Sequence, residues 1–154
     1  MGKRVYTDAH AAVRFFAPTL DPLDVTLALR LPADHTHRCG EPRLVRRGRT
    51  GEVHEYAPYP AGSWSMSSKQ WVNSPRLHVH LAWLLDQLEP KADAVAKLIQ
   101  DGANVDFFCY SSGYTRLHPA IPRAIRERAR RLGIVIEIDH YPMREDDREL
   151  TIGE

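Results

Sequence analysis

The sequence predicts an α+β fold: a two-layer sandwich in which helices cover one face of a mixed or antiparallel sheet of about four to five strands. Three observations support this prediction. Strand-like and helix-like segments follow one another in the order β-α-(β)-β-α-β-α-β. Residues 134–140 alternate apolar with polar side chains, which is typical of a sheet with one solvated face. The chain has 154 residues, which suits one domain with a core over about residues 11–141 and loose ends at 1–10 and 143–154.

The first strand and the first helix are expected before residue 32. Residues 11–17 are mostly apolar and aromatic, and they predict a strand that a proline ends. Asp21 is suited to the N-cap of the next helix because its carboxylate can accept backbone N–H groups. Pro22 is suited to the first helical position, where no amide hydrogen is needed. The expected apolar stripe of this helix is Leu23, Leu27 and Leu31.

Residues 32–62 read as one long connection, rich in proline, glycine and arginine. Such a connection inside a compact domain is usually functional or mobile. Within it, residues 53–56 predict a short edge strand. Residues 64–68 alternate large with small side chains and predict a strand of the sheet.

The second half of the chain carries the strongest helical pattern. Five leucines recur at helical spacing from residue 77, and Pro90 interrupts or restarts that helix. Residues 104–110 predict a strand followed by a Ser-Ser-Gly turn. A helix over 119–132 and a final strand over 134–140 complete the sheet. The leucines are Leu77, Leu81, Leu84, Leu85 and Leu88.

Composition excludes several classes of protein. The net charge is +1 at pH 7 with histidine neutral, whereas nucleic-acid-binding domains usually have isoelectric points above about 9. Cys39 and Cys109 are too few for a disulfide framework and are expected as free thiols. The chain lacks an apolar run of about 20 residues and the apolar core of a signal peptide. These absences predict a cytoplasmic protein without a membrane span, and the missing glycine-rich phosphate loop predicts no cofactor.

Five segments carry motifs of a known family in the right order. They include the sequence THRCGEPR at residues 36–43 and GSWSMSS at residues 62–68. On these motifs the chain resembles domain of unknown function 4279, a group of small bacterial proteins. The resemblance implies a small bacterial α+β domain and assigns no reaction. A longer, arginine-rich stretch at 43–60 departs from the family pattern. The five segments are 20–26, 36–43, 62–68, 80–92 and 105–109.

The loop around His37 is the first candidate site. Arginine binds carboxylate or phosphate in a bidentate manner, and serine hydroxyls can donate further hydrogen bonds. A small anionic ligand is therefore one possibility, and a solvated basic loop is the other. The residues expected at this site are His37, Arg38, Arg43, Trp64 and Ser65.

The same loop is also a weak candidate for a metal site. Imidazole nitrogens and a thiolate are good zinc ligands. However, the H-x-H-x-C spacing matches no structural zinc motif and supplies no fourth ligand, so no metal is predicted. The weak candidates are His35, His37 and Cys39.

The solvated face of the predicted sheet is the second candidate site. If the strand phases hold, aromatic and charged side chains share that face, and such a face can dock a partner because aromatic residues are enriched at interfaces. Cross-strand ion pairing is the alternative explanation. The residues are Arg14, Phe16, Asp106, Phe108, Tyr110, Glu137, Asp139 and Tyr141.

These observations favour a non-enzymatic binding or protein-interaction module, with a protein partner or a second copy of the chain. The alternative is an enzyme or binding protein that takes a small anionic ligand at the His37 and Arg38 loop. It requires those side chains and residues 63–68 to converge on one pocket. Nucleic acid is disfavoured, although the helix at 119–132 carries five arginines.

Overall fold

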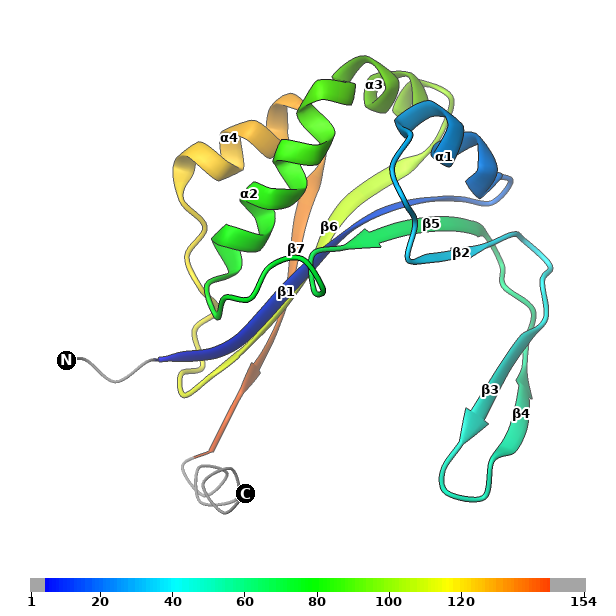
Figure 1. Ribbon diagram of the computed structural model, residues 1–154, viewed down its shortest axis with the longest axis horizontal. Helices are drawn as coiled ribbons and strands as arrows, with labels where there is room; N and C mark the ends of the chain where they lie inside the picture. Colours follow the sequence, from blue (N-terminus) through cyan, green and yellow to red (C-terminus); the bar gives the residue numbers. More distant parts are fainter. Residues whose placement is uncertain (1–4, 145–154) are drawn as a thin grey trace.

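Helices cover one face of a five-stranded sheet, and the opposite face is open (Figure 1). The computed structural model describes residues 5–144 of the chain. The strands run in the order β2-β5-β1-β6-β7, and neighbours are antiparallel except for β6 and β7, which are parallel. The α+β sandwich predicted from the sequence is confirmed. The strands are β1 (Tyr6–Ala17), β2 (His35–His37), β5 (Gly62–Ser67), β6 (Asn104–Gly113) and β7 (Val135–Pro142).

The first helix begins, and the second is interrupted, at the residues predicted from the sequence. Asp21 caps the first helix, and its Oδ1 accepts the amide of Leu23 at 3.0 Å. Pro90 lies in a 3-10 turn, η1 (Glu89–Lys91), that separates the second helix from the third. No helix within residues 5–144 is long and apolar enough to cross a membrane. The helices are α1 (Pro22–Leu29), α2 (Leu77–Leu88), α3 (Ala92–Gln100) and α4 (Arg123–Arg131).

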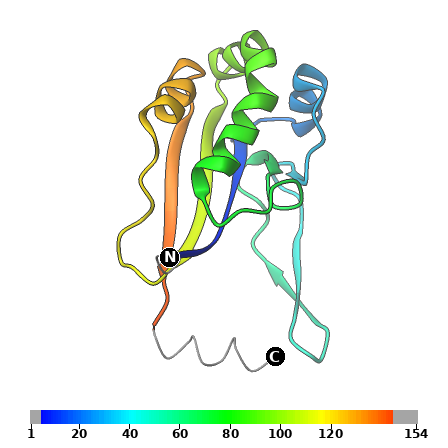
Figure 2. The ribbon, with the colours of Figure 1, turned by 60° about the vertical axis from the view of Figure 1, so that its left-hand side comes forward.

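A two-stranded hairpin, which we call the arm, extends from one edge of the sheet. It consists of β3 (Arg43–Arg47) and β4 (Glu52–Tyr56), which pair with each other and form a separate sheet. The arm points away from the helices, toward the side of the open face (Figures 1 and 2). The short strand predicted at 53–56 therefore exists, but β2 takes the sheet-edge position beside β5.

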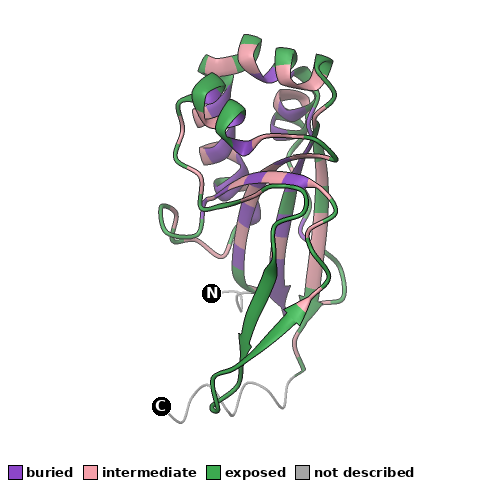
Figure 3. Cartoon of the chain, turned by 90° about the vertical axis from the view of Figure 1, so that its right-hand side faces the viewer, coloured by how far each residue is buried: buried purple, intermediate pink, exposed green. Residues whose placement is uncertain are grey.

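The core lies between the helices and the sheet. Every second residue of β1 from Ala9 to Phe15 is buried, because successive side chains of a strand point to opposite faces. The five leucines predicted on the second helix are all buried against this layer. Figure 3 shows the buried residues gathered between sheet and helices, whereas both strands of the arm are exposed.

The first helix buries a different stripe from the predicted one. Val25 and Leu29 are fully buried. The indole Nε1 of Trp64 donates to Oγ1 of Thr26 at 3.0 Å, which turns this side of α1 toward the sheet. The predicted stripe was therefore wrong, and its first two members are 51% and 65% exposed. That stripe was Leu23, Leu27 and Leu31.

Two strands are longer than the sequence predicted. β1 begins at Tyr6, so residues 6–10 are not loose. The Ser-Ser-Gly segment continues β6 to Gly113 and does not form a turn. Each extension supplies the pairing partner of the other, since Tyr6 lies opposite Gly113. A Cβ atom on Gly113 would lie 2.5 Å from the carbonyl oxygen of Val5, so the close approach requires glycine. Of the predicted loose end at 143–154, residues 145–154 lie outside the described residues.

A buried hydrogen-bond chain ties α2 to the sheet. Nε2 of His80 faces the carbonyl oxygen of Ser74 at 2.7 Å, so this nitrogen carries the proton. Nδ1 then accepts from Oγ of Ser68 at 2.7 Å. The same hydroxyl oxygen accepts the amide of Ala11 at 3.0 Å. Ser68 is 0% and His80 is 1% exposed, so the pair has a structural role and cannot meet a substrate.

Ser68→Ala is expected to destabilise the protein by about 1–3 kcal/mol, because it leaves a buried imidazole nitrogen and a buried amide without partners. Chemical denaturation measures this change. Ser65→Ala, on the half-exposed side of β5, which ends one residue before Ser68, is the matched control and should change stability by less than about 0.5 kcal/mol. Equal effects of the two substitutions would contradict the proposed chain.

Candidate functional site

The open face of the sheet gathers the aromatic and charged residues predicted from the strand phases. Register places Arg14 opposite Asp106 across β1 and β6. It also places Phe108 beside Glu137, and Tyr110 beside Asp139, across β6 and β7. Because these strands share one pleat, all of these side chains point away from the helices. The predicted composition of this face is confirmed.

An ion pair lies at the centre of the open face. Arg14 donates to both carboxylate oxygens of Asp106, with Nε–Oδ1 at 2.8 Å and Nη2–Oδ2 at 2.6 Å. Its guanidinium carbon lies 4.4 Å from the ring centroid of Phe108 and 5.7 Å from that of Phe16. The hydrogen bond to Asp106 raises the pKa of Arg14. This pair lies against the half-buried ring of Phe16 and the exposed ring of Phe108.

An aromatic cluster extends from the ion pair toward the far end of β7. The ring of His10 stacks on Tyr110 with centroids 4.8 Å apart, and Tyr110 lies 5.5 Å from Tyr141. Burial lowers the pKa of His10, and the charge of Lys69 lowers it further, so the ring is neutral at pH 7. The hydroxyl of Tyr141 donates to Asp139 at 2.7 Å, which raises the pKa of Tyr141.

The arm is fixed to the sheet edge by alternating aromatic and cationic groups. His37 stacks on Tyr59 with ring centroids 3.6 Å apart. The guanidinium of Arg43 lies 5.6 Å from the ring of Tyr59 and 5.2 Å from that of Tyr56. Arg47 contacts the same ring of Tyr56 at 5.3 Å and donates to its hydroxyl. Cation–π contacts of this kind stabilise by about 0.5–1 kcal/mol at exposed sites, so together they hold the arm in place.

The structure does not bring the predicted loop residues together. His37 and Ser65 lie on the open face, and Arg43 lies on the arm. Arg38 instead pairs with Asp21, the N-cap of α1, with Nη2–Oδ1 at 3.2 Å. Trp64 is 0% exposed and belongs to the core, whereas its neighbour Ser65 points to the open face. The reason is the two-residue period of β5, which sends neighbouring side chains to opposite faces.

The weak metal candidates are not grouped as ligands. Cys39 is exposed, and its Sγ donates to the carbonyl oxygen of Pro60 at 3.5 Å. The ring of His37 is engaged with Tyr59, while His35 lies two residues earlier on β2. Within residues 5–144 no three histidine, cysteine or acidic side chains are placed to hold a metal ion together.

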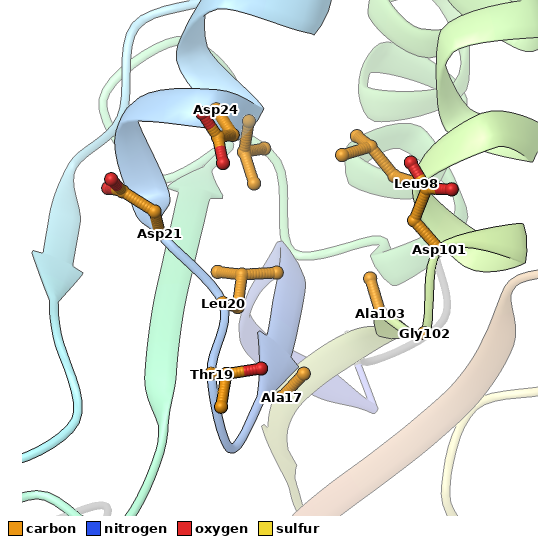
Figure 4. A pocket seen from close by; sticks show the side chains of 10 residues that line it. Ala17, Thr19, Leu20, Asp21, Asp24, Leu98, Asp101, Gly102 and Ala103 are labelled. Carbon is orange, nitrogen blue, oxygen red and sulfur yellow. The ribbon is translucent and has the colours of Figure 1, made fainter.

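Figure 4 shows a pocket of about 180 Å³ beside α1 and the end of α3. The carboxylates of Asp21, Asp24 and Asp101 line it. Asp21 is occupied by the α1 cap and by Arg38, and Asp101 pairs with Lys97 at 3.3 Å. An acidic lining opposes an anionic ligand, so this pocket does not support the anion-binding alternative.

The arginine-rich helix α4 is partly neutralised by its neighbours. Arg128 pairs with Asp86 at 2.7 Å and also with Glu89, which joins α4 to the end of α2. These hydrogen bonds raise the pKa of Arg128. Arg130 pairs with Glu127 on the same helix at 3.0 Å. The charge of Arg128 therefore contributes to the packing of α4 against the end of α2.

The sequence reasoning missed the two tyrosines that hold the arm. Tyr56 ends the short strand that was predicted at 53–56, and Tyr59 falls in the part of the connection that was expected to be irregular. The sequence did contain a signal for these contacts. Arg43 and Arg47 are four residues apart, so in a strand they lie on one side, where both can meet an aromatic ring on a paired strand. Recognising it depended on pairing residues 43–47 with 52–56 across a glycine-containing turn.

An α+β domain with an open sheet face and an exposed arm is the class of structure that these residues define. The family model described as Domain of unknown function (DUF4279) matches residues 6–143, and the chain belongs to this family. No curated protein and no solved structure matches the chain. The family match therefore spans both the open face and the arm and assigns an activity to neither.

Tyr59→Ala should loosen the arm, because it removes the ring between His37 and Arg43. Loss of a stacked pair worth about 1 kcal/mol should speed tryptic cleavage within the arm about fivefold. Mass spectrometry of the fragments after timed proteolysis measures this rate. Tyr59→Phe keeps the ring and should cleave at the wild-type rate. An unchanged rate in the alanine variant would mean that the stack does not hold the arm.

Thiol reactivity should distinguish the two cysteines. Burial raises the pKa of Cys109 to about 12, with a smaller contribution from the charge of Asp106. Cys109 therefore stays protonated at pH 8, whereas Cys39 is exposed. Peptide mass spectrometry after iodoacetamide treatment should find Cys39 modified in the native protein and Cys109 modified only after denaturation. Equal labelling of both in the native state would show that the core opens readily around β6.

Proposed function

We propose that this domain is a non-enzymatic protein-interaction module whose binding surface is the open face of the sheet. One observation carries the proposal: no helix in the described part of the chain covers this face, although aromatic rings gather on it. Phe108 is 37% and Tyr141 is 52% exposed. Monomeric proteins rarely leave contiguous aromatic surface exposed unless it serves binding.

The chemistry of the face selects a cationic and apolar partner. The part of the face formed by β1, β6 and β7 carries three carboxylates, those of Asp106, Glu137 and Asp139. Arg14 supplies the one guanidinium among them. Rings beside those carboxylates can accept arginine or lysine through cation–π contacts. The partner we propose therefore presents arginine or lysine next to aliphatic side chains.

Geometry also favours binding over catalysis. The enzymatic alternative requires His37, Arg38 and residues 63–68 to converge on one pocket. Arg38 is directed to the α1 cap, and the segment after Gly62 divides its side chains between core and face. The buried Ser68 and His80 pair is shielded from any substrate.

A small anionic ligand at the base of the arm is the second candidate. The observation that favours it is Nδ1 of His37, a buried nitrogen with no hydrogen-bond partner among the described residues. The guanidinium of Arg43 lies 5.6 Å from the ring of Tyr59, on which His37 stacks, and it has its own donors. Calorimetric titration with inorganic phosphate and with citrate tests this candidate, and heat that persists in Arg43→Ala would overturn it.

The interaction proposal is tested with a displayed random peptide library selected on the wild-type protein. Enriched peptides should combine arginine or lysine with aliphatic residues. Fluorescence anisotropy should show binding that weakens about tenfold in Phe108→Ala and in Glu137→Lys, because central interface residues typically contribute more than about 1 kcal/mol.

Leu27→Ala is the matched control, since Leu27 is an exposed apolar side chain in the helical layer. It should bind the same peptides as the wild type does. Enrichment of peptides without basic residues, or binding that Phe108→Ala and Glu137→Lys leave unchanged, would overturn the proposed surface.

A further inference from the structure

The arm is too exposed to be explained by contacts within one copy of the chain. Each residue of β3 is exposed, and β4 is exposed up to Tyr56. Leu44 is 60% and Val53 is 54% exposed, so apolar side chains face solvent on the arm. A lone two-stranded hairpin is marginally stable in water. The contacts of Tyr56 and Tyr59 with His37, Arg43 and Arg47, which we call the aromatic brace, hold one side of the arm. Within the described residues, the aliphatic side chains of Leu44 and Val53 are still left exposed.

The arm carries the chemistry that the open face selects. Between residues 43 and 56 it has four arginines against two glutamates. Arg46 lies opposite Val53 in the hairpin register, and Leu44 lies two residues away on the same side. This side of the arm therefore presents a guanidinium between the aliphatic side chains of Leu44 and Val53, with Glu55 opposite Leu44. Arg46 is exposed and, unlike Arg43 and Arg47, takes no part in the brace.

The arm and the acidic part of the open face lie at opposite edges of the sheet. β2, which leads into the arm, is one edge strand, and β7, which carries Glu137 and Asp139, is the other. β1 is the middle strand. A two-fold axis parallel to β1, between two copies with their open faces together, brings the arm of each copy to the β7 side of the other. Such a two-fold interface uses the same surface of both copies, so the assembly ends at two copies.

Length is consistent with this arrangement. Five strand residues extend about 17 Å, and sheets packed face to face lie about 10 Å apart. An arm that descends on the open side therefore reaches the level of the facing sheet. There it meets an edge strand whose Val135 is 59% exposed and whose Glu137 lies on the open face.

We infer that two copies of this chain form an arm-exchanged homodimer, in which Arg46 and Leu44 of each arm pack on Glu137 and Val135 of the other copy. This inference rests on the proposed function, because it names the partner of the same open face. The second copy completes a surface that is incomplete in one copy, since the basic arm supplies the cation that the acidic β7 side lacks.

Sedimentation equilibrium of the full chain, at concentrations from about 1 to 100 µM, tests the inference. The wild type should be dimeric. Arg46→Glu alone and Glu137→Arg alone should each weaken the dimer at least about tenfold, because each places like charges together across the interface. Lys97→Glu, on the exposed side of α3, is the control and should leave the dimer unchanged.

Mixing the two variants gives the decisive result. A copy with Arg46→Glu and a copy with Glu137→Arg restore opposite charges at both contacts, so their mixture should form a heterodimer near wild-type affinity. The double variant should also dimerise. Failure of both rescues, or single variants as dimeric as the wild type, would overturn the arm exchange.

The outcome also separates this inference from the function on which it rests. A chain that stays monomeric up to about 100 µM, yet binds selected basic peptides through Phe108, overturns the homodimer and leaves the interaction module in place. A monomeric chain that binds no peptide through Phe108 overturns both. Circular dichroism of every variant confirms that each one is folded before it is compared.

Discussion

The two-residue period of the middle strand sets the organisation of this domain. β1 pairs with β5 on one side and with β6 on the other, so the phase of its side chains is imposed on both neighbours. Phe15 and Val13 face the helices, while Arg14 and Phe16 face away. A slip of one residue would place a guanidinium in the core. The separation of a packed face from an open face is thus a single constraint, and it holds across the five strands.

Hydrogen bonds on both faces of the sheet hold this register of the strands. In the core, the hydroxyl of Ser68 joins the backbone of β1 to His80 on α2. On the open face, Arg14 on β1 donates two hydrogen bonds to the carboxylate of Asp106 on β6. Both sets of hydrogen bonds require a particular orientation of donor and acceptor, whereas apolar packing does not. The open face therefore has an ion pair at its centre and aromatic rings around it.

Much of the fold could be predicted from the sequence because its signals are local. Asp21, Pro22 and Pro90 act on the backbone within a few residues, and the leucines of α2 carry their own period. The composition of the open face followed from strand phase alone. The buried stripe of α1 did not, because a tryptophan 38 residues away selects it. The aromatic brace was missed for the same reason, since Tyr59 contacts His37 only because the β3–β4 hairpin reverses the chain between them. Side chains that meet across long loops leave no periodic trace in the sequence.

The two ends of the arm segment are joined by the backbone itself. The amide of Gly40 donates to the carbonyl of Tyr59 at 2.8 Å, and the amide of Tyr59 donates to Glu41 at 3.2 Å. None of the residues between these bonds belongs to the core. The domain can therefore lengthen, shorten or replace its arm without disturbing the sheet. A change in this one loop would therefore alter the surface that the arm presents, while the sheet and its register stay the same.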